Sequence, residues 1–200
     1  MFRIKTLLGL AACAIFISLP AFPQDESPGR NEVSAQAFGS FLKSTTSNGA
    51  RQEATNSGGV LGSYRFFFSR NHGVEANYGY SLNTQSYRFA GTSTGVPSYS
   101  HEISGAYVFR YPLKRWTPFL LAGAGGLIFD PKDTPGINSQ TRAAFVYGGG
   151  ADVDLTHHIF FRGEYRGLVY NSPTYDIPGL EGLDRVTHRA EPSVGFGYRF

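Results

Sequence analysis

Five histidines are the residues of this chain best suited to metal chemistry. They are His72, His101, His157, His158 and His188. A zinc site needs three or four protein ligands that the fold brings together. No pair of these histidines has metal-ligand spacing with a third ligand close by in the sequence. The pattern therefore predicts no metal site and no cofactor.

Two glycine-rich stretches and a set of acids are the other candidates for binding chemistry. Residues 123–126 are similar to part of a phosphate loop, but no Lys-Ser/Thr pair follows them. Glycine in strands more often permits bending or close packing, and residues 148–150 fit the same interpretation. The acids of the turn-rich segments are too scattered for a calcium loop; they are Asp130, Asp133, Asp176, Glu181 and Asp184.

A larger set of arginines and carboxylates does follow a pattern. These residues occupy every second position of several segments, which we call one parity. The positions between them, the other parity, are apolar and aromatic. If the apolar parity faces lipid, the charged parity faces the axis of a closed sheet. Unpaired buried charge is costly, so we expect these side chains to pair. Bases outnumber acids in this set, which consists of Arg65, Glu75, Glu102, Arg110, Arg142, Asp152, Arg162, Glu164, Arg166, Glu191 and Arg199.

Eight segments of strand length must position these charges. The last one shows the alternation most clearly, with Val194, Phe196, Tyr198 and Phe200 on one parity and small or charged residues on the other. Residues 117–129 are apolar on both parities, which leaves their orientation open. The eight segments cover residues 33–43, 59–69, 74–89, 98–111, 117–129, 140–154, 159–170 and 188–200.

The connections between these segments alternate in length. Those after the second, fourth and sixth segments are short, and the others are longer and rich in turn-forming residues. This asymmetry is typical of outer-membrane barrels, which have short periplasmic turns and longer extracellular loops. The sequence thus predicts an all-β fold, an eight-stranded antiparallel up-and-down transmembrane β-barrel. Both termini are expected in the periplasm and the longer loops outside the cell.

A soluble lipocalin-like barrel would place the same two parities the other way round. The terminal Phe200, the expected absence of cysteine from the mature chain, and the many Tyr and Phe residues favour the membrane barrel. Tyr107 is then a mid-strand site facing lipid. The expected periplasmic girdle of rings at headgroup level consists of Tyr111, Trp116, Phe160, Phe161, Tyr198 and Phe200.

Three interpretations of the charged interior remain open. Eight strands enclose a space that side chains can fill, so the charges can form an ion-pair plug that keeps the barrel closed. A narrow, weakly anion-preferring passage is the second, because rings of bases can select anions. A catalytic role for the acids is the third.

The N-terminus has the pattern of a secretory signal peptide. Arg3 and Lys5 precede an apolar run over residues 6–19, followed by small and helix-breaking residues. We therefore divide the chain into a leader (1–23), a flexible lead-in (24–32) and a barrel domain (33–200). Alternative interpretations are a single membrane-spanning helix, for which the run is short, and a lipid anchor on Cys13. The net charge of +3 is too small and scattered to indicate nucleic acid as a partner.

Together these features resemble the small OmpA/OmpX-type outer-membrane β-barrel family of Gram-negative bacteria. The resemblance covers residues 33–200 and rests on the leader, the eight alternating segments, the loop asymmetry and residues 196–200. Residues 62–80 look like the second hairpin limb of such domains. The chain carries no peptidoglycan-binding domain after the eighth segment, which leaves a cell-wall tether in doubt.

The resemblance implies a structural or surface-interaction role in the outer membrane, in contact with lipid and lipopolysaccharide. It also implies insertion by the barrel-assembly machinery, which reads the closing strand through Phe196, Tyr198 and Phe200. A small porin-like channel is the alternative function. Some related barrels deacylate lipid A and are marked by His-x-Ser on a lipid-facing strand. None of the histidines here is followed two positions later by Ser, so we expect no enzyme.

Overall fold

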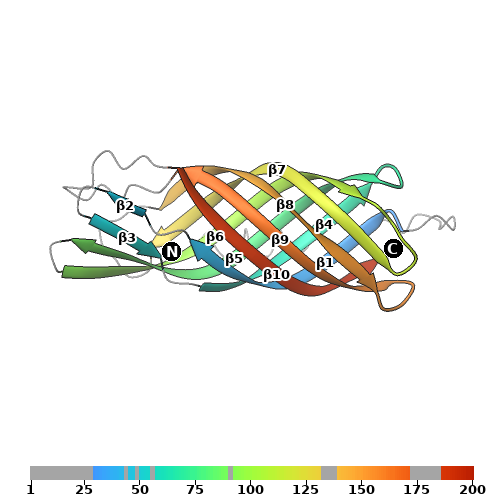
Figure 1. Cartoon of the computed structure of the whole chain (residues 1–200), viewed down its shortest axis with the longest axis horizontal. Helices are drawn as coiled ribbons and strands as arrows, with labels where there is room; N and C mark the ends of the chain where they lie inside the picture. Colours follow the sequence, from blue (N-terminus) through green and yellow to red (C-terminus); the bar gives the residue numbers. More distant parts are fainter. Residues whose placement is uncertain are drawn as a thin grey trace, which may run out of the picture.

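The computed structural model describes residues 29–42, 45–47, 50–54, 57–89, 92–131, 139–171 and 186–200. The predicted leader and most of the predicted lead-in lie outside these residues. Ten β-strands make up the described part (Figure 1). They are β1 (Asn31–Leu42), β2 (Thr45–Ser47), β3 (Ala50–Ala54), β4 (Ser57–Phe67), β5 (His72–Phe89), β6 (Thr92–Arg110), β7 (Trp116–Pro131), β8 (Gln140–Asp154), β9 (Ile159–Asn171) and β10 (Val186–Arg199).

Eight of these strands close into a barrel, which confirms the predicted fold class. Their order is β5-β4-β1-β10-β9-β8-β7-β6, and pairing of β5 with β6 completes the ring. Every pair is antiparallel, and the strands wind steeply around an elongated cylinder (Figure 1). Closure leaves no unpaired edge, which is the condition for crossing lipid with strands. Among the described residues, no helix is long and apolar enough to cross a membrane.

The two ends of the barrel differ. One end carries the tight connections at residues 68–71, 111–115 and 155–158, together with Phe200, and we call it the turn end (Figure 1). Here Asn31 and Phe200 exchange both backbone hydrogen bonds, at 2.9 and 3.1 Å. We call the opposite end the loop end.

The loop end departs from the sequence prediction in two places. The long connection expected after the third segment is mostly strand, because β5 and β6 stay paired from Asn83↔Ser98 to Phe89↔Thr92. The first long connection contains the hairpin of β2 and β3, and β3 pairs with the outer part of β5.

At the turn end, β1 begins two residues before the predicted segment. Asn31 and Glu32, which we assigned to the lead-in, therefore belong to the barrel.

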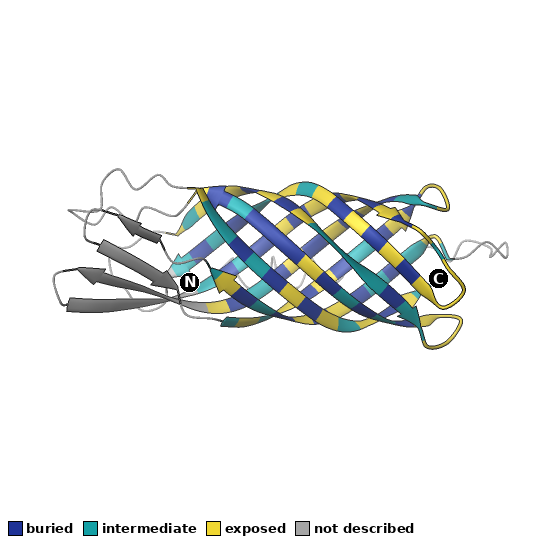
Figure 2. Ribbon diagram, viewed as in Figure 1, coloured by how far each residue is buried: buried dark blue, intermediate teal, exposed yellow. Residues whose placement is uncertain are grey.

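Burial alternates along each strand, as Figure 2 shows by its checkered blue and yellow ribbon. The outer face exposes large apolar side chains, among them Val60, Ile103, Leu120 and Phe196. The open parity of residues 117–129 is settled by β7, in which Phe119 is buried while Leu120 is 66% exposed. The expected aromatic girdle is wrong at one position. Phe160 is fully buried inside the barrel, because it shares the parity of the charged residues of β9.

The interior is not polar throughout. Strands β6 to β9 contribute an inward apolar wall that reaches toward the loop end, and Phe67 of β4 joins it. This wall explains why β7 is apolar on both faces, since one face meets lipid and the other meets this core. Its members include Val108, Leu121, Leu127, Phe129, Val146, Leu168 and Tyr170.

Candidate functional site: a charged barrel interior

Three interior ion pairs join residues that lie directly opposite each other on neighbouring strands, and one of them joins Glu32 of β1 to Arg199 of β10. Arg65 on β4 faces Glu75 on β5, and their side chains form a salt bridge. Arg162 on β9 faces Asp152 on β8 and donates two hydrogen bonds to it, at 2.7 and 2.8 Å. Opposite charges across an antiparallel pair stabilise it, and a one-residue slip would turn each charge toward lipid. These pairs therefore fix the strand register.

Other contacts cross the barrel and join the pairs into one network. Arg162 also reaches Glu32 of β1 at 3.0 Å, and Arg65 reaches Glu164 of β9 at 3.3 Å. Arg166 of β9 forms a salt bridge with Glu102 of β6. Acids and bases consequently alternate from the turn end inward through Asp154, Arg199, Glu32, Arg162, Asp152, Arg65, Glu164, Arg166 and Glu102.

Arg189 and Glu191 of β10 form a separate pair nearer the loop end. Arg189 Nε lies 2.7 Å from Glu191 Oε1. The guanidinium of Arg189 also donates to the hydroxyls of Ser81 and Ser100, at 3.1 and 3.2 Å. This arginine therefore links β10 to β5 and β6 across the interior.

Inward phenylalanines cover several of the guanidinium groups. The Arg110 guanidinium lies 3.4 Å from the ring centroid of Phe67, and that of Arg65 lies 4.0 Å from the centroid of Phe119. Arg162 lies 4.8 Å from the centroid of Phe160. Cation–π contacts of desolvated arginines are worth about 2 kcal/mol. The inward rings thus support the network and exclude water from it.

The charges of the interior balance. In the part of the chain that the structure describes, five arginines and six acids are buried, and Arg199, whose side chain is 13% exposed, brings the bases to six. The buried bases are Arg65, Arg110, Arg162, Arg166 and Arg189, and the acids are Glu32, Glu75, Glu102, Asp152, Glu164 and Glu191. The small excess of bases in the sequence-derived set disappears because Arg142 is only half-buried, while Glu32 and Arg189 add one charge of each sign.

Most of the charged residues named from the sequence lie buried in this interior, with Glu191 in the separate pair with Arg189 and Arg142 nearer the loop end. Arg142 is half-buried near the loop end of β8, where its Nη2 donates to Gln140 Oε1 at 3.3 Å. Sequence reasoning missed Glu32 because it lies in a polar run that we assigned to the lead-in. It missed Arg189 although the parity of Glu191 and Arg199 already pointed to it.

The other candidates for chemistry lie elsewhere. His72, His101 and His188 pair with tyrosines on strands of the barrel, and the Nε2 of His188 lies 2.7 Å from the Tyr147 hydroxyl. Within the described ranges, no group of three or more His, Cys, Asp or Glu residues could hold a metal ion. The glycines of β7 serve close packing, since a Cβ on Gly123 would meet the backbone of β6. Asp130 ends up in β7, and the other four loop acids lie outside the described residues.

Comparison with known proteins places this geometry in a family. The model of the outer membrane protein beta-barrel domain matches residues 9–200. This chain belongs to that family. Membership confirms the expected outer-membrane location and agrees with the closed eight-stranded fold. Barrels of this family lie in contact with the lipids of the outer membrane.

Curated relatives and solved structures agree with this assignment. The 25 kDa outer-membrane immunogenic proteins of Brucella abortus and Brucella canis are 28% identical over 129 residues, which is 64% of this chain and 58% of each relative. Neisserial surface protein A has a similar fold, with a TM-score of 0.62 at 13% identity over 88% of this chain and all of that one. OprG of Pseudomonas aeruginosa gives a TM-score of 0.61 at 14% identity, covering 86% and 96%.

Proposed function

We propose that this protein is a closed outer-membrane barrel that carries an extended sheet beyond the membrane for surface interactions. The observation that carries the proposal is the pairing of β5 with β6 beyond the barrel wall. The β6–β7 ladder ends at Ser98↔Pro131, whereas the β5–β6 ladder continues to Phe89↔Thr92. Strands β2 and β3 widen this projection, which Figure 1 shows at the loop end.

The orientation of the barrel follows from the lengths of its connections. Outer-membrane barrels have their short turns in the periplasm and their longer loops outside the cell. We therefore place the turn end in the periplasm and the projecting sheet outside. Lipopolysaccharide fits as a neighbour of the projecting sheet, because it forms the outer leaflet around the loop end.

Single cysteines test this orientation. In a Cys13→Ser background, Thr92→Cys at the tip of the projecting hairpin should react with a membrane-impermeant maleimide on intact cells. Lys114→Cys, in the turn between β6 and β7, should react after the outer membrane is permeabilised and not before. Labelling is measured by the gel shift of a maleimide polymer. The reverse labelling pattern would contradict the proposed orientation.

The closed interior supports a non-conducting barrel. The ion pairs, the inward phenylalanines and the apolar wall fill the space that eight strands enclose. We expect purified protein in planar bilayers to show no regular single-channel steps. A wide porin reconstituted in the same way is the control for insertion. Uniform steps that scale with salt concentration would instead support the small-channel alternative.

We also propose that the barrel is not an enzyme. The interior carboxylates that could act as a catalytic acid or base each have an arginine partner, as in Glu75 with Arg65 and Glu102 with Arg166. Ion-pair networks of this kind perturb titration without doing chemistry. Mass spectrometry of lipid A from cells with and without the protein tests this proposal. A change in acyl-chain content that depends on the protein would support a lipid-modifying enzyme.

The outer face of β10 is our candidate for recognition by the barrel-assembly machinery. Tyr198 and Phe200 stack with ring centroids 6.2 Å apart, and Phe196 packs against Phe161 of β9. All three closing-strand rings are exposed on the lipid-facing side. The three rings lie at alternate positions along the outer face of β10, toward the turn end.

Substitution of one ring tests the role of these three rings. Phe200→Ser should lower the amount of folded, heat-modifiable protein in the outer membrane several-fold, while refolding of the purified chain into detergent stays efficient. Phe68→Ser is the matched control, because Phe68 is also an exposed ring at the turn end. Equal loss in both variants would mean that the amount of exposed apolar surface at the turn end, rather than recognition of β10, limits assembly.

A further inference from the structure

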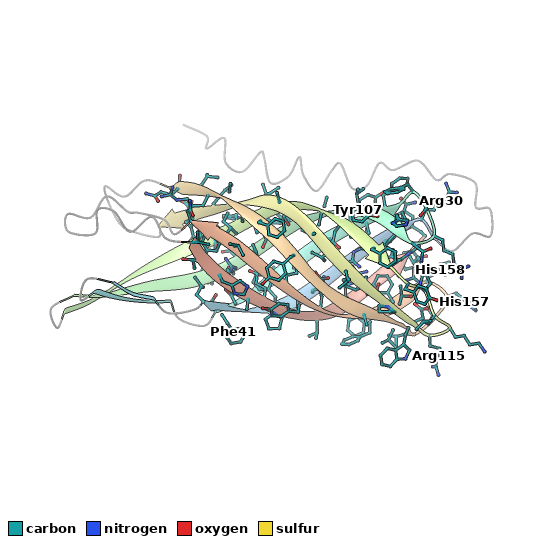
Figure 3. All side chains as sticks on the ribbon, turned by 45° about the horizontal axis from the view of Figure 1, so that its top comes forward. Arg30, Phe41, Tyr107, Arg115, His157 and His158 are labelled. Atoms are coloured by element: carbon teal, nitrogen blue, oxygen red, sulfur yellow. The ribbon has the colours of Figure 1, made fainter. Side chains whose placement is uncertain are left out.

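A cavity of about 420 Å³ opens at the turn end of the barrel. It lies between the connection at 68–71, the connection at 111–115 and the end of β10. Figure 3 shows basic side chains gathered at this end, with Arg30, Arg115, His157 and His158 labelled. The residues that line the cavity are Arg30, Phe67, Ser69, Arg70, Arg110, Pro112, Leu113, Thr117, Asp154 and Arg199.

Positive charge exceeds negative charge around this cavity. Four arginines line it, and the acids close to them are Asp154 in the wall and Glu32 just beneath. Arg110, Arg199 and Glu32 belong to the balanced interior set, so Arg30 and Arg70 against Asp154 leave the cavity with a net positive charge. Arg30 and Arg70 are exposed at the rim, and within the described part of the chain neither side chain forms an ion pair.

The two deeper arginines are held in place. Arg110 stacks on Phe67, donates from Nε to the carbonyl of Arg70 at 3.1 Å, and donates from Nη1 to Glu32 at 2.6 Å. Arg199 donates to Glu32 and Asp154, at 2.9 and 3.0 Å. Its buried Nη2 has no acceptor among the described residues. Rigid guanidinium groups with a donor to spare beside apolar walls are suited to a planar or tetrahedral oxyanion.

We propose that this turn-end cavity binds a phosphate monoester dianion. A phosphate monoester carries about −1.5 to −2 charges at neutral pH, which the two rim arginines can offset. Its three terminal oxygens can accept from Arg30 and Arg70 at the rim and from the guanidinium groups below. The group can come from a soluble phosphate ester or from a lipid with a terminal phosphate. Neither the surface role nor the closed interior is needed for this binding.

Titration with inorganic phosphate tests the proposal. The barrel is folded in octyl glucoside, and amide NMR shifts of residues 70 and 113 are followed at constant ionic strength with chloride as the reference. We expect saturable shifts with phosphate and none with chloride. The variant Arg30→Ala/Arg70→Ala should bind phosphate at least about tenfold more weakly, because each charge-assisted hydrogen bond is worth at least that factor.

The matched control is Lys114→Ala/Arg115→Ala, which removes two basic residues from the same end that do not line the cavity. Phosphate affinity should stay unchanged in this variant, and heat modifiability checks that both variants are folded. The proposal is overturned if phosphate causes no saturable shift, or if the control loses affinity as much as the rim variant. Phosphatidylcholine nanodiscs with and without phosphatidic acid distinguish the sources. Shifts induced by phosphatidic acid alone identify a lipid, and shifts that need added phosphate identify a soluble ester.

Discussion

Replacing Arg162 by methionine should destabilise the folded barrel by about 3–5 kcal/mol, which is the typical cost of breaking a buried ion pair on one side. Arg162 is fully buried and holds both Asp152 and Glu32. Its loss leaves Asp152 without its two short hydrogen bonds, in a place that water does not reach. The free energy of unfolding can be measured by urea titration of the protein in lipid vesicles, with Trp116 fluorescence as the signal.

Two further variants separate pairing from packing. Arg115→Met removes an exposed arginine from the turn between β6 and β7 and should change stability very little. Arg162→Met/Asp152→Leu removes both partners and should recover most of the loss, because Glu32 keeps Arg110 and Arg199 as partners. A loss below about 1 kcal/mol for Arg162→Met would show that water solvates the interior charges.

The second large effect is expected on the outer face. Ile103 lies near the middle of the barrel portion of β6 and is 57% exposed toward lipid. Arginine near the bilayer midplane costs about 2–4 kcal/mol, whereas near an interface the cost falls to about 0–1 kcal/mol. Ile103→Arg should therefore lower the free energy of unfolding in vesicles by about 2–4 kcal/mol.

Tyr107→Arg is the comparison. From the sequence we expected Tyr107 to be a mid-strand site, and the structure shows that this was wrong. Tyr107 lies in the turn-end half of the barrel (Figure 3), where its hydroxyl contacts His72 at the start of β5. The Tyr107 variant should thus lose clearly less stability than the Ile103 variant. If the two variants lose the same amount, the membrane does not cover the barrel as proposed.

The contacts that the sequence could predict are those within hairpins. Arg65 and Glu75 are equally far from the middle of the turn that joins β4 and β5, so hairpin register alone brings them together. The same holds for Asp152 and Arg162 around the turn between β8 and β9. Alternating parity and hairpin symmetry therefore predict the strands, their inner faces and the first layer of ion pairs.

The contacts across the barrel could not be predicted in this way. Arg162 and Glu32 are 130 residues apart, and Arg166 and Glu102 are 64 residues apart. Which inward residues share a level depends on strand tilt and shear, which a single strand's alternation does not encode. Phe67 breaks the alternation of residues 59–69. Its inward ring is explained by Arg110 of β6, whose guanidinium group stacks on it.

The composition of the projecting hairpin did not indicate that it would form strands. Residues 90–97 are rich in Gly, Ser, Thr and Pro, which indicates a loop. Residues 92–97 are nevertheless strand, because β5 supplies a complete partner up to Phe89. Proline is tolerated on edge strands, and Pro97 lies just beyond the last pair between β6 and β7.

The equal numbers of acids and bases along the axis also bear on how such a protein can change over time. A lineage that exchanges Glu32 alone removes a partner from Arg110, Arg162 and Arg199 at once, because all three share its carboxylate. Tolerated replacements inside the cylinder should therefore arrive as compensating sets, whereas the projecting hairpin is free to diversify one position at a time. A deep mutational scan should thus show strong epistasis along the axis and near-independent effects at the tip.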